Sequence, residues 1–510
     1  MSFHFSKSKF VSACTRCNKY AWLDKYMPEQ KAAVSEFTQS LFDNGHKVGA
    51  LAQKYLHADI DVTAYTEDGS LDLGAMIRET AKHMRAGTPA IAEASFSFDG
   101  FFCSVDVLLR NTDGSYDLCE VKSSKQEKST KKNPSGVPEK YILDSAYQRY
   151  VLEHCGVNVR KVYVVMLSRD YIRGRDFNLN EYFVRRDVTV ATAAKQVYIA
   201  TKLAELEPIL DNSNEPLSVL CDHCNGCDYF DYCSRHVSSP SPFDVYGLKF
   251  SDKCAYYRDG VPFEAIPYVH PNLAEVARLQ IAYHDRPQDA HIDKRIIQSF
   301  LNSLTYPLYS LDFETYQAVV PEFEGMKTYE QIPFQYSLHK VPAPDADLAD
   351  IEERHFLELS GADPRRAIAE RLVQDIPYGA CVVAYHRSTE QGIIGRLAAQ
   401  FSDLADHLLS FTYRDPRDVF SQGGYYVAAM GKSLSLKSVA PALYPHDAAM
   451  DYHNLEGAIK NGTQAMNAIG KAGELSESER EQLRRDLENY CALDTMAVVK
   501  ILNKLYEVSG

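Results

Sequence analysis

The chain has 510 residues, more than a single hydrophobic core usually organises, so two or three domains are expected. Hydrophobic residues make up 45% and charged residues 24%, as in globular proteins, and no apolar run is long enough to span a bilayer. The formal net charge of −14 argues against a protein that coats nucleic acid nonspecifically. It does not exclude a nuclease, whose bound metal ions supply positive charge. The start of the chain lacks an apolar signal segment, so we expect a cytoplasmic protein.

The N-terminal part predicts a helix followed by a meander of three strands. Apolar residues recur at helical spacing between positions 34 and 51, where Gly45 and Gly49 either allow close packing or end the helix. Three stretches with strand character follow, divided by Asp-Gly turn signals: residues 94–98, 101–109 and 116–121.

Polar side chains interrupt two of these apolar strands. Asp106 lies in the second, and Glu120 and Lys122 lie two apart in the third, so they share one strand face. If the strands are neighbours, two carboxylates can hold a divalent metal while the ammonium orients water or stabilises charge on a phosphate. A surface salt bridge between Glu120 and Lys122 is the alternative. The apolar neighbours on both strands favour a functional site.

These residues resemble the PD-(D/E)XK nuclease superfamily, in particular its RecB-type branch, over about residues 1–235. That branch includes the iron–sulfur nucleases of CRISPR adaptation and of helicase–nuclease repair complexes. The resemblance implies that Asp106 and Glu120 bind metal, that Lys122 serves the attacking water and that Gln148 assists from a following helix. It also implies DNA as the substrate of this half. His46 lies near the place of a further histidine ligand, but its register does not match and it is not assigned.

Residues 122–132 read KSSKQEKSTKK and allow two interpretations. By composition they form a solvated loop. Their position directly after Glu-x-Lys equally predicts a loop that binds phosphate groups beside the metal site.

The 12 cysteines fall into two classes. A scattered set lies among apolar residues and is expected to be small and buried: Cys103, Cys119, Cys155, Cys254, Cys381 and Cys491. A second set is grouped in sequence, as the pair Cys14 and Cys17 and the cluster Cys221, Cys224, Cys227 and Cys233. In a reducing compartment, grouped thiols predict a metal centre before a disulfide.

Zinc is the generic assignment for such a cluster. The resemblance to the iron–sulfur branch implies a 4Fe–4S cluster instead, with one ligand near the N-terminus and three near the end of the domain. Cys17, Cys227 and Cys233 match three of these positions. The fourth ligand is Cys224 by one spacing and Cys221 by another. The cluster would join the two ends of the domain and stabilise its fold.

Residues 238–242 read SSPSP and mark a domain boundary. The segment that follows, to about residue 300, predicts one helix over 272–284 and no chemistry, so we interpret it as a connector.

The second domain begins with a predicted strand, Ser310–Thr315. Asp312 and Glu314 project from one of its faces, while Leu311 and Phe313 project from the other. Two adjacent carboxylates repel each other unless cations lie between them. Oxygen ligands favour Mg²⁺ or Mn²⁺, although two solvated acids at a strand end are the simpler reading of this motif alone.

Four further elements carry polar residues, pair with this strand or lead into a helix that carries one. Residues 334–341 predict its partner, and a short buried strand at 381–385 precedes a helix with Glu390 in its first turn. A late helix over 487–502 places Tyr490 and Asp494 four apart on one face. They form either a surface pair on an amphipathic helix or a phenol that orients water beside a metal-binding carboxylate.

This order of motifs resembles the DEDD exonucleases, which have the ribonuclease H-like fold; Tyr490 marks the DEDDy group. The resemblance implies two metal ions held by Asp312, Glu314, Glu390 and Asp494, a water positioned by Tyr490, and cleavage from a 3′ end. Glu390 stands where that family has aspartate, His386 where it has asparagine, and Thr389 where it has an aromatic residue. The longer Glu390 side chain moves its carboxylate by about one bond length.

The whole layout resembles a bacterial two-domain family of unknown function that pairs these two nuclease-like halves. The segment Ser433–Lys437 shares in this likeness. It predicts either a contact with the substrate backbone or a helix start capped by Ser433 or Ser435.

Together these patterns predict an α/β protein with three parts. They are a PD-(D/E)XK restriction-endonuclease-like domain with a cysteine cluster (1–238), a connector (239–300) and a ribonuclease H-like DEDD exonuclease domain (301–510). The predicted function is metal-dependent hydrolysis of nucleic acid, DNA in particular, with no membrane partner. The alternative is a nucleic-acid-binding scaffold of a defence or repair complex, with protein partners and one or both sites inactive.

Overall fold

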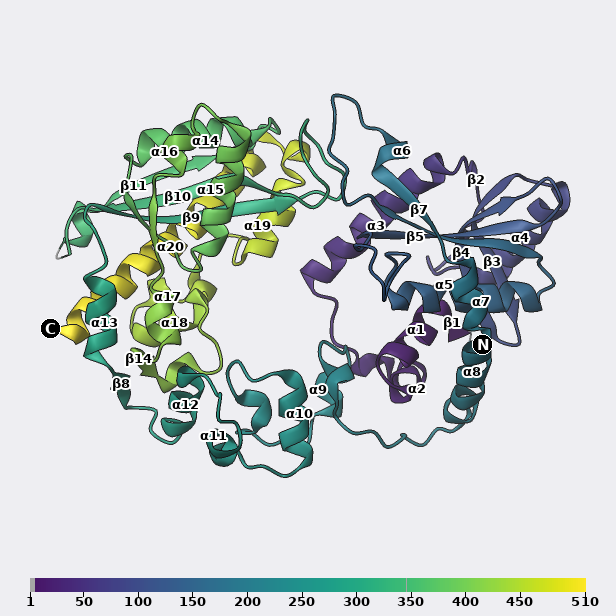
Figure 1. The fold of residues 1–510 in the computed structure, drawn as a ribbon, viewed down its shortest axis with the longest axis horizontal. Coiled ribbons are helices and arrows are strands. Elements are labelled where there is room, and N and C mark those ends of the chain that lie inside the picture. Colours follow the sequence, from purple (N-terminus) through teal and green to yellow (C-terminus); the bar gives the residue numbers. More distant parts are fainter. Residues whose placement is uncertain (1–4, 345) are drawn as a thin grey trace. The chain divides into compact units, whose positions relative to one another are not determined.

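The computed structural model describes residues 5–344 and 346–510, and the chain divides into two compact units, both of mixed α/β type. The first unit ends at His236 but also contains Ala318–Glu330; the second contains Val237–Gln317 and Gln331–Gly510. The predicted connector is therefore part of the second unit, and a short segment predicted in the C-terminal domain is part of the first. Figure 1 shows the elements of each unit.

The first unit is built on a seven-stranded sheet in the order β2-β3-β4-β5-β6-β7, with β1 beside β4. Its strands are β1 (Phe5–Ser6), β2 (Ile60–Asp61), β3 (Ala90–Phe98), β4 (Phe101–Arg110), β5 (Tyr116–Lys125), β6 (Val159–Leu167) and β7 (Phe183–Asp187). Its helices are α1 (Lys7–Thr15), α2 (Asn18–Tyr26), α3 (Glu36–Tyr55), α4 (Leu73–Ala86), α5 (Glu139–His154), α6 (Leu179–Tyr182), α7 (Thr189–Ala194), α8 (Gln196–Asp211) and α9 (Phe230–Cys233).

The predicted meander is confirmed, since β3, β4 and β5 pair antiparallel in sequence order. Asp99 and Gly100 both have positive φ and form the tight turn between β3 and β4. Helix α3 continues through Gly45 and Gly49, and a Cβ added at either glycine would meet no atom within 4 Å. The two glycines therefore neither end the helix nor pack closely.

Residues Ala318–Glu330 are fixed within the first unit by side chains and backbone. Val319 is buried in one of its hydrophobic clusters, and the Tyr182 hydroxyl donates to the Val319 carbonyl at 2.8 Å. The Tyr329 hydroxyl donates to the Ser123 carbonyl at 2.8 Å, just beyond Lys122. This segment therefore completes the fold of the first unit although it follows strand β9 in sequence.

The second unit contains a five-stranded sheet in the order β11-β10-β9-β12-β13 and a two-stranded sheet of β14 and β8. Its strands are β8 (Ala290–Ile292), β9 (Leu308–Gln317), β10 (Gln331–Val341), β11 (Glu352–Leu357), β12 (Cys381–Val383), β13 (Thr412–Arg414) and β14 (Tyr425–Val427). Its helices are α10 (Phe250–Arg258), α11 (Ile266–Val269), α12 (Glu275–Ala282), α13 (Lys294–Leu301), α14 (Pro364–Asp375), α15 (Ser388–Gln400), α16 (Ala405–Leu408), α17 (Arg417–Ser421), α18 (Leu436–Leu443), α19 (Gly462–Ile469) and α20 (Glu477–Ser509).

Strand β9 is central to this sheet, antiparallel to β10 and parallel to β12. Tyr309, Leu311 and Phe313 pack with α14, α15 and α16 on one face, while α20 lies across the other (Figure 1). The predicted division of faces is confirmed: the Ser310 hydroxyl donates to the Thr495 carbonyl of α20 at 2.9 Å, and Asp312 faces the same helix. The two acidic side chains of β9 are thus directed toward α20.

Two further features of the described chain bear on the predictions. All 12 cysteines have free thiols; five of the scattered set are buried as predicted, but Cys155 is exposed at the end of α5, so that prediction is wrong. Within residues 5–344 and 346–510, no helix has both the length and the apolar character that crossing a membrane requires.

Candidate functional site

The C-terminal site forms where β9 meets the middle of α20. Asp312, Glu314 and Cys491 present ligand atoms that all lie within 4.8 Å of one another. Among the described residues, this is the one set of three or more acidic, histidine or cysteine side chains gathered so closely. Hydrogen bonds from Ser310 and from the Gln335 amide, at 2.9 and 2.8 Å to carbonyls of α20, fix the helix on the sheet.

Tyr490 and Asp494, the pair predicted on the late helix, join this set from α20. Tyr490 and Asp494 are 4% and 7% exposed, so they are not a surface pair on an amphipathic helix. Coulombic interaction with Asp494 raises the pKa of both Asp312 and Glu314, which places the three carboxylates within electrostatic reach. The structure therefore brings the Asp312 and Glu314 pair of β9 together with the Tyr490 and Asp494 pair of α20.

Burial and mutual repulsion dominate the titration of these acids. Burial, then the charges of Asp494, Glu314 and Glu390, raise the pKa of Asp312 well above its usual range. Burial and Asp494 raise the pKa of Glu314 to about 8. Burial raises the pKa of Asp494 to about 6, although a hydrogen bond from the Tyr452 hydroxyl opposes this shift. The cluster carries more negative charge than its surroundings neutralise.

Glu390 lies in the first turn of α15, as predicted, and is 3% exposed. Burial and the nearby Asp415 raise its pKa to about 8, and its charge acts on Asp312. Its Oε2 atom is buried and has no hydrogen-bond partner in the described chain. A buried carboxylate oxygen without a partner is costly, and a bound cation would satisfy it. These acids therefore fit a divalent ion with oxygen ligands.

Two residues of this site were not assigned from the sequence. The Tyr452 hydroxyl donates a hydrogen bond to Asp494 Oδ1, and the Lys437 ammonium donates one to the Tyr490 hydroxyl at 3.0 Å. Repulsion by Asp494, in addition to burial, raises the pKa of both tyrosines, so both remain protonated. Tyr452 lies in a short helical turn with no periodicity to reveal it. The position of Lys437 after Ser-Leu-Ser-Leu was the one available signal.

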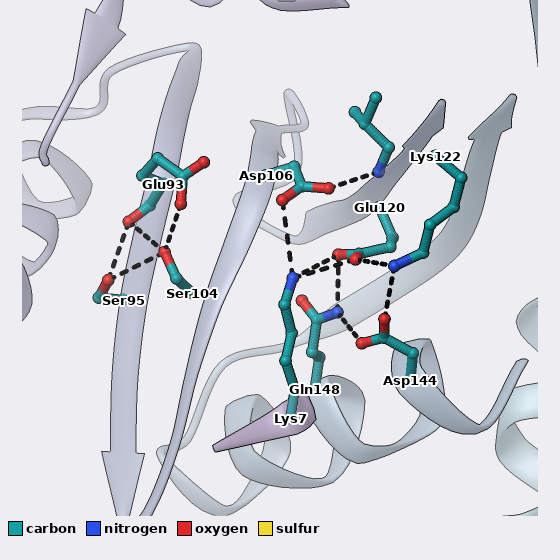
Figure 2. A network of polar contacts seen from close by, with 10 residues as sticks. Lys7, Glu93, Ser95, Ser104, Asp106, Glu120, Lys122, Asp144 and Gln148 are labelled. Atoms are coloured by element: carbon teal, nitrogen blue, oxygen red, sulfur yellow. Dashed lines mark hydrogen bonds and ion pairs between the residues drawn. The ribbon is translucent and has the colours of Figure 1, made fainter. Parts of the chain in front are cut away.

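The structure also brings together the residues that were predicted for the N-terminal site. Glu120 of β5 is 1% exposed, accepts from Lys122 Nζ at 2.7 Å and accepts from Gln148 Nε2 at 2.7 Å (Figure 2). Asp106 of β4 accepts from the Val121 backbone N–H at 2.6 Å, which holds it beside β5. Helix α5 supplies Gln148 and also Asp144, which accepts from Lys122 at 2.6 Å. Asp144 precedes Gln148 by one helical turn, so helical spacing could have revealed it.

Lys7 distinguishes this site from the C-terminal one. It lies in the first turn of α1, and its ammonium is 3.0 Å from each Glu120 carboxylate oxygen and 3.6 Å from Asp106 Oδ1 (Figure 2). It thus bridges the two carboxylates that were predicted to share a metal. Three carboxylates, of Asp106, Glu120 and Asp144, face two ammonium groups, whose pKa values the carboxylates raise despite burial. The side chains of this site neutralise most of its charge.

A cavity of about 750 Å³ opens beside Asp106 and Lys122. Its lining includes Glu93 of β3, a residue with φ of +56°, and His46 of α3. Burial and the neighbouring Asp106 raise the pKa of Glu93 to about 7. His46 therefore does line the cavity of this site, although its sequence register gave no basis for assigning it.

The cysteine cluster gathers at the other end of α1. Cys17, Cys224, Cys227 and Cys233 line one small cavity, whereas Cys221 does not. The Arg16 guanidinium donates to the carbonyls of His223, Asn225 and Gly226 at 3.0, 2.6 and 2.8 Å, which fixes the loop on the N-terminal helices.

The spacing of the sulfur atoms bears on the kind of metal centre. A tetrahedral zinc ion with Zn–S bonds of about 2.3 Å holds its sulfur ligands about 3.8 Å apart. No three of these thiols lie within 4.8 Å of one another in the described chain. In any three of these thiols, at least two sulfur atoms are therefore farther apart than the sulfur ligands of one zinc ion.

Comparisons with known proteins identify one region. Residues 309–435 match the family model described as "Domain of unknown function (DUF2779)", a range that includes Asp312, Glu314 and Glu390 but not Tyr490 or Asp494. No curated protein matches the chain. A solved structure titled "Crystal structure of SSO0001" is similar at 14% identity over 47% of this chain and 89% of its own, with a TM-score of 0.21. A likeness this weak assigns neither fold nor function.

Proposed function

We propose that the second unit is a metal-dependent nuclease that hydrolyses phosphodiester bonds of nucleic acid. The observation that carries the proposal is a group of four acids with raised pKa values, Asp312, Glu314, Glu390 and Asp494. One carboxylate oxygen of this group is buried and has no hydrogen-bond partner in the part of the chain that the structure describes. Such a group is stable in the ionised form only with a bound cation. The central β9 with helices on both faces of its sheet supports a ribonuclease H-like domain of the DEDDy group.

Asp312, Glu314, Asp494 and Glu390 would hold Mg²⁺ or Mn²⁺. Bound there, the ions lower the pKa of a coordinated water and neutralise charge on the phosphate. In the reaction the water oxygen bonds to phosphorus and the ester P–O bond breaks. One proton of the water passes to the leaving oxygen, which departs as an alcohol. The protonated Tyr490 hydroxyl orients the attacking water, and Tyr452 fixes Asp494. By resemblance, the cut is made from a 3′ end.

For the first unit, we propose a PD-(D/E)XK-like domain that binds DNA. A metal bound between Asp106 and Glu120 requires Lys7 to move away, because its ammonium bridges these carboxylates. This contact favours the alternative function for this half, a nucleic-acid-binding scaffold whose own site is inactive. We assign Cys17, Cys224, Cys227 and Cys233 to a 4Fe–4S cluster that stabilises this unit.

Digestion of end-labelled single- and double-stranded DNA and RNA with Mn²⁺ tests the proposal. Wild type should shorten a strand from its 3′ end, Asp494→Ala should not, and Glu120→Ala should retain the activity. Asp403→Asn, at a surface carboxylate paired with Arg366, is the matched control in the second unit. If all these proteins behave alike, the C-terminal site is not catalytic. If Glu120→Ala alone is inactive, catalysis belongs to the first unit.

A further inference from the structure

Lys437 lies beside the acids of the C-terminal site, and binding of a metal ion by those four acids gives this lysine no role. Helix α18 begins at Leu436, so the segment Ser433–Lys437 contains a helix start, but the side chain of the N-cap residue Ser435 makes no capping hydrogen bond, so the predicted cap is not formed. The other interpretation, contact with the substrate backbone, depends on where the lysine side chain lies.

The Lys437 ammonium is held beside Tyr490 and Tyr452. It donates to the Tyr490 hydroxyl at 3.0 Å and to the Lys460 carbonyl at 3.0 Å. The same nitrogen lies over two aromatic rings, 4.7 Å from the centroid of Tyr490 and 4.9 Å from that of Tyr452. These four contacts fix a long side chain that is otherwise exposed to solvent.

One of the three ammonium protons is left for a ligand. Two protons are taken by Tyr490 and Lys460, and no third acceptor lies within hydrogen-bond distance in the described chain. Burial lowers the pKa of Lys437 from its ordinary value, and the charges of Asp494, Glu314 and Asp312 oppose this shift, so the ammonium lies within electrostatic reach of these acids. Within the described residues, Lys437 is also the one cation that lowers the pKa of Glu314 and Asp494.

We propose that Lys437 is a catalytic residue of this site, whose third N–H donates to a non-bridging oxygen of the scissile phosphate. This inference rests on the proposed nuclease function. A phosphodiester that approaches four carboxylates is repelled, and the lysine offsets that repulsion beside Tyr490. As negative charge grows on the non-bridging oxygens during attack by water, a fixed ammonium stabilises it. In this role Lys437 acts as a charged hydrogen-bond donor and transfers no proton.

Two substitutions at Lys437 test this role on a labelled single-stranded DNA with Mn²⁺. Lys437→Met should lower kcat by about 10²-fold, the usual loss on removing one donor to a developing charge. Lys437→Arg keeps the charge and a donor, and should recover part of that loss. The control Lys432→Met removes an exposed lysine five residues earlier that pairs with Asp244, and should stay within about twofold of wild type.

Phosphorothioate substrates identify the atom that Lys437 contacts. Sulfur at the contacted non-bridging oxygen should slow wild type strongly and Lys437→Met much less, because the two changes remove the same interaction. Sulfur at the other oxygen should slow both proteins equally. Equal thio effects for both oxygens in both proteins, or a kcat of Lys437→Met equal to that of wild type, would overturn the inference.

Binding of Mn²⁺, measured by electron paramagnetic resonance, separates this inference from the proposed function. Lys437→Met should bind Mn²⁺ at least as tightly as wild type, since no ligand is lost and one competing cation is removed. Loss of Mn²⁺ binding in this variant would mean that Lys437 only supports the fold, and would overturn its catalytic role. A wild type that binds no Mn²⁺ and cleaves nothing would instead refute the nuclease function itself.

Discussion

The two units each bury several carboxylates around a strand of a central sheet, but they balance the charge differently. In the first unit, Lys7 and Lys122 lie 3.0 and 2.7 Å from the buried Glu120, so ion pairs within the chain offset most of the negative charge. In the second unit, the acids repel one another, and a carboxylate oxygen of Glu390 has no hydrogen-bond partner among residues 5–344 and 346–510. A charge deficit of this kind is what a divalent ion corrects.

This comparison teaches that an acidic motif alone does not identify a metal site. Asp106 with Glu-x-Lys and Asp312 with Glu314 look equally suited to metal in the sequence. The difference lies in which cations the fold brings to them. We therefore assign the stronger metal site to the second unit, and the following predictions test that assignment.

The largest contrast should appear in the rate of hydrolysis after one matched change in each unit. Asp494→Asn should lower the Mn²⁺-dependent rate by about 10³-fold, because it removes a metal ligand that stabilises the transition state by several kcal/mol. Asp106→Asn should leave that rate within about threefold, because it lies in the other site. Initial rates on 3′-labelled DNA measure both. Equal losses in the two variants would erase the distinction between the units.

A second contrast separates the two neighbouring thiols of the cysteine cluster. Cys224→Ala should abolish the iron content and brown colour of protein purified without air, because Cys224 lines the cavity shared with Cys17, Cys227 and Cys233. Cys221→Ala should retain both. Iron and sulfide analysis on the two variants decides the fourth ligand, and zinc in place of iron in wild type would contradict the cluster assignment.

Stability should change in opposite directions for the same substitution in the two units. Glu120→Gln leaves Lys7 and Lys122 without their shared counter-ion and should lower the free energy of unfolding by about 3 kcal/mol. Glu314→Gln removes a carboxylate with a pKa raised to about 8 and should raise the free energy of unfolding of the metal-free protein by about 2 kcal/mol at neutral pH. Urea denaturation with a chelator measures both.

The control for this experiment is the same measurement with saturating Mn²⁺. There Glu314→Gln should become destabilising, because the variant binds the ion less tightly than wild type does. A loss of stability for Glu314→Gln in the chelator would mean that its carboxylate is already compensated within the fold.

The smallest expected effect is on the pH dependence of metal binding. The pKa values of Asp494 and Glu314 are raised to about 6 and about 8, so these groups retain protons in the folded protein that they lose in the unfolded one. The metal-free protein should therefore lose stability as pH rises from about 4 toward 8. Mn²⁺ must displace these protons, so its affinity should rise by about tenfold per pH unit between pH 6 and 8 for each proton displaced.

Titrations by calorimetry at several pH values give this slope. Glu120→Gln should show the slope of wild type, since it lies outside the metal site. A Mn²⁺ affinity that does not change between pH 6 and 8 would show that the acids of the second unit are already ionised without the ion.

Much of each site follows from local periodicity. The alternation along residues 310–315 predicts that Asp312 and Glu314 share a face, and helical spacing predicts that Tyr490 and Asp494 do; the structure places both pairs together. The same reasoning places Gln148, which does contact Glu120. These predictions need only the pitch of one strand or helix.

The cations could not be predicted in this way, since they arrive from distant parts of the chain. Lys7 is 113 residues from Glu120 in sequence, in a polar segment typical of a solvated terminus. Lys437 reaches Tyr490 across 53 residues. The placement of Ala318–Glu330 in the first unit is equally a tertiary result, because burial of Val319 and not a local signal determines it.

The central claim is that a divalent ion binds among the acids of the second unit and not between the lysine-bridged acids of the first. The most direct measurement is the anomalous scattering of Mn²⁺ in crystals of the protein grown with that ion. The account predicts a strong peak within bonding distance of Asp312 and Asp494, and none between Asp106 and Glu120. A peak at Asp106 and Glu120 alone, with Lys7 turned away, would contradict it.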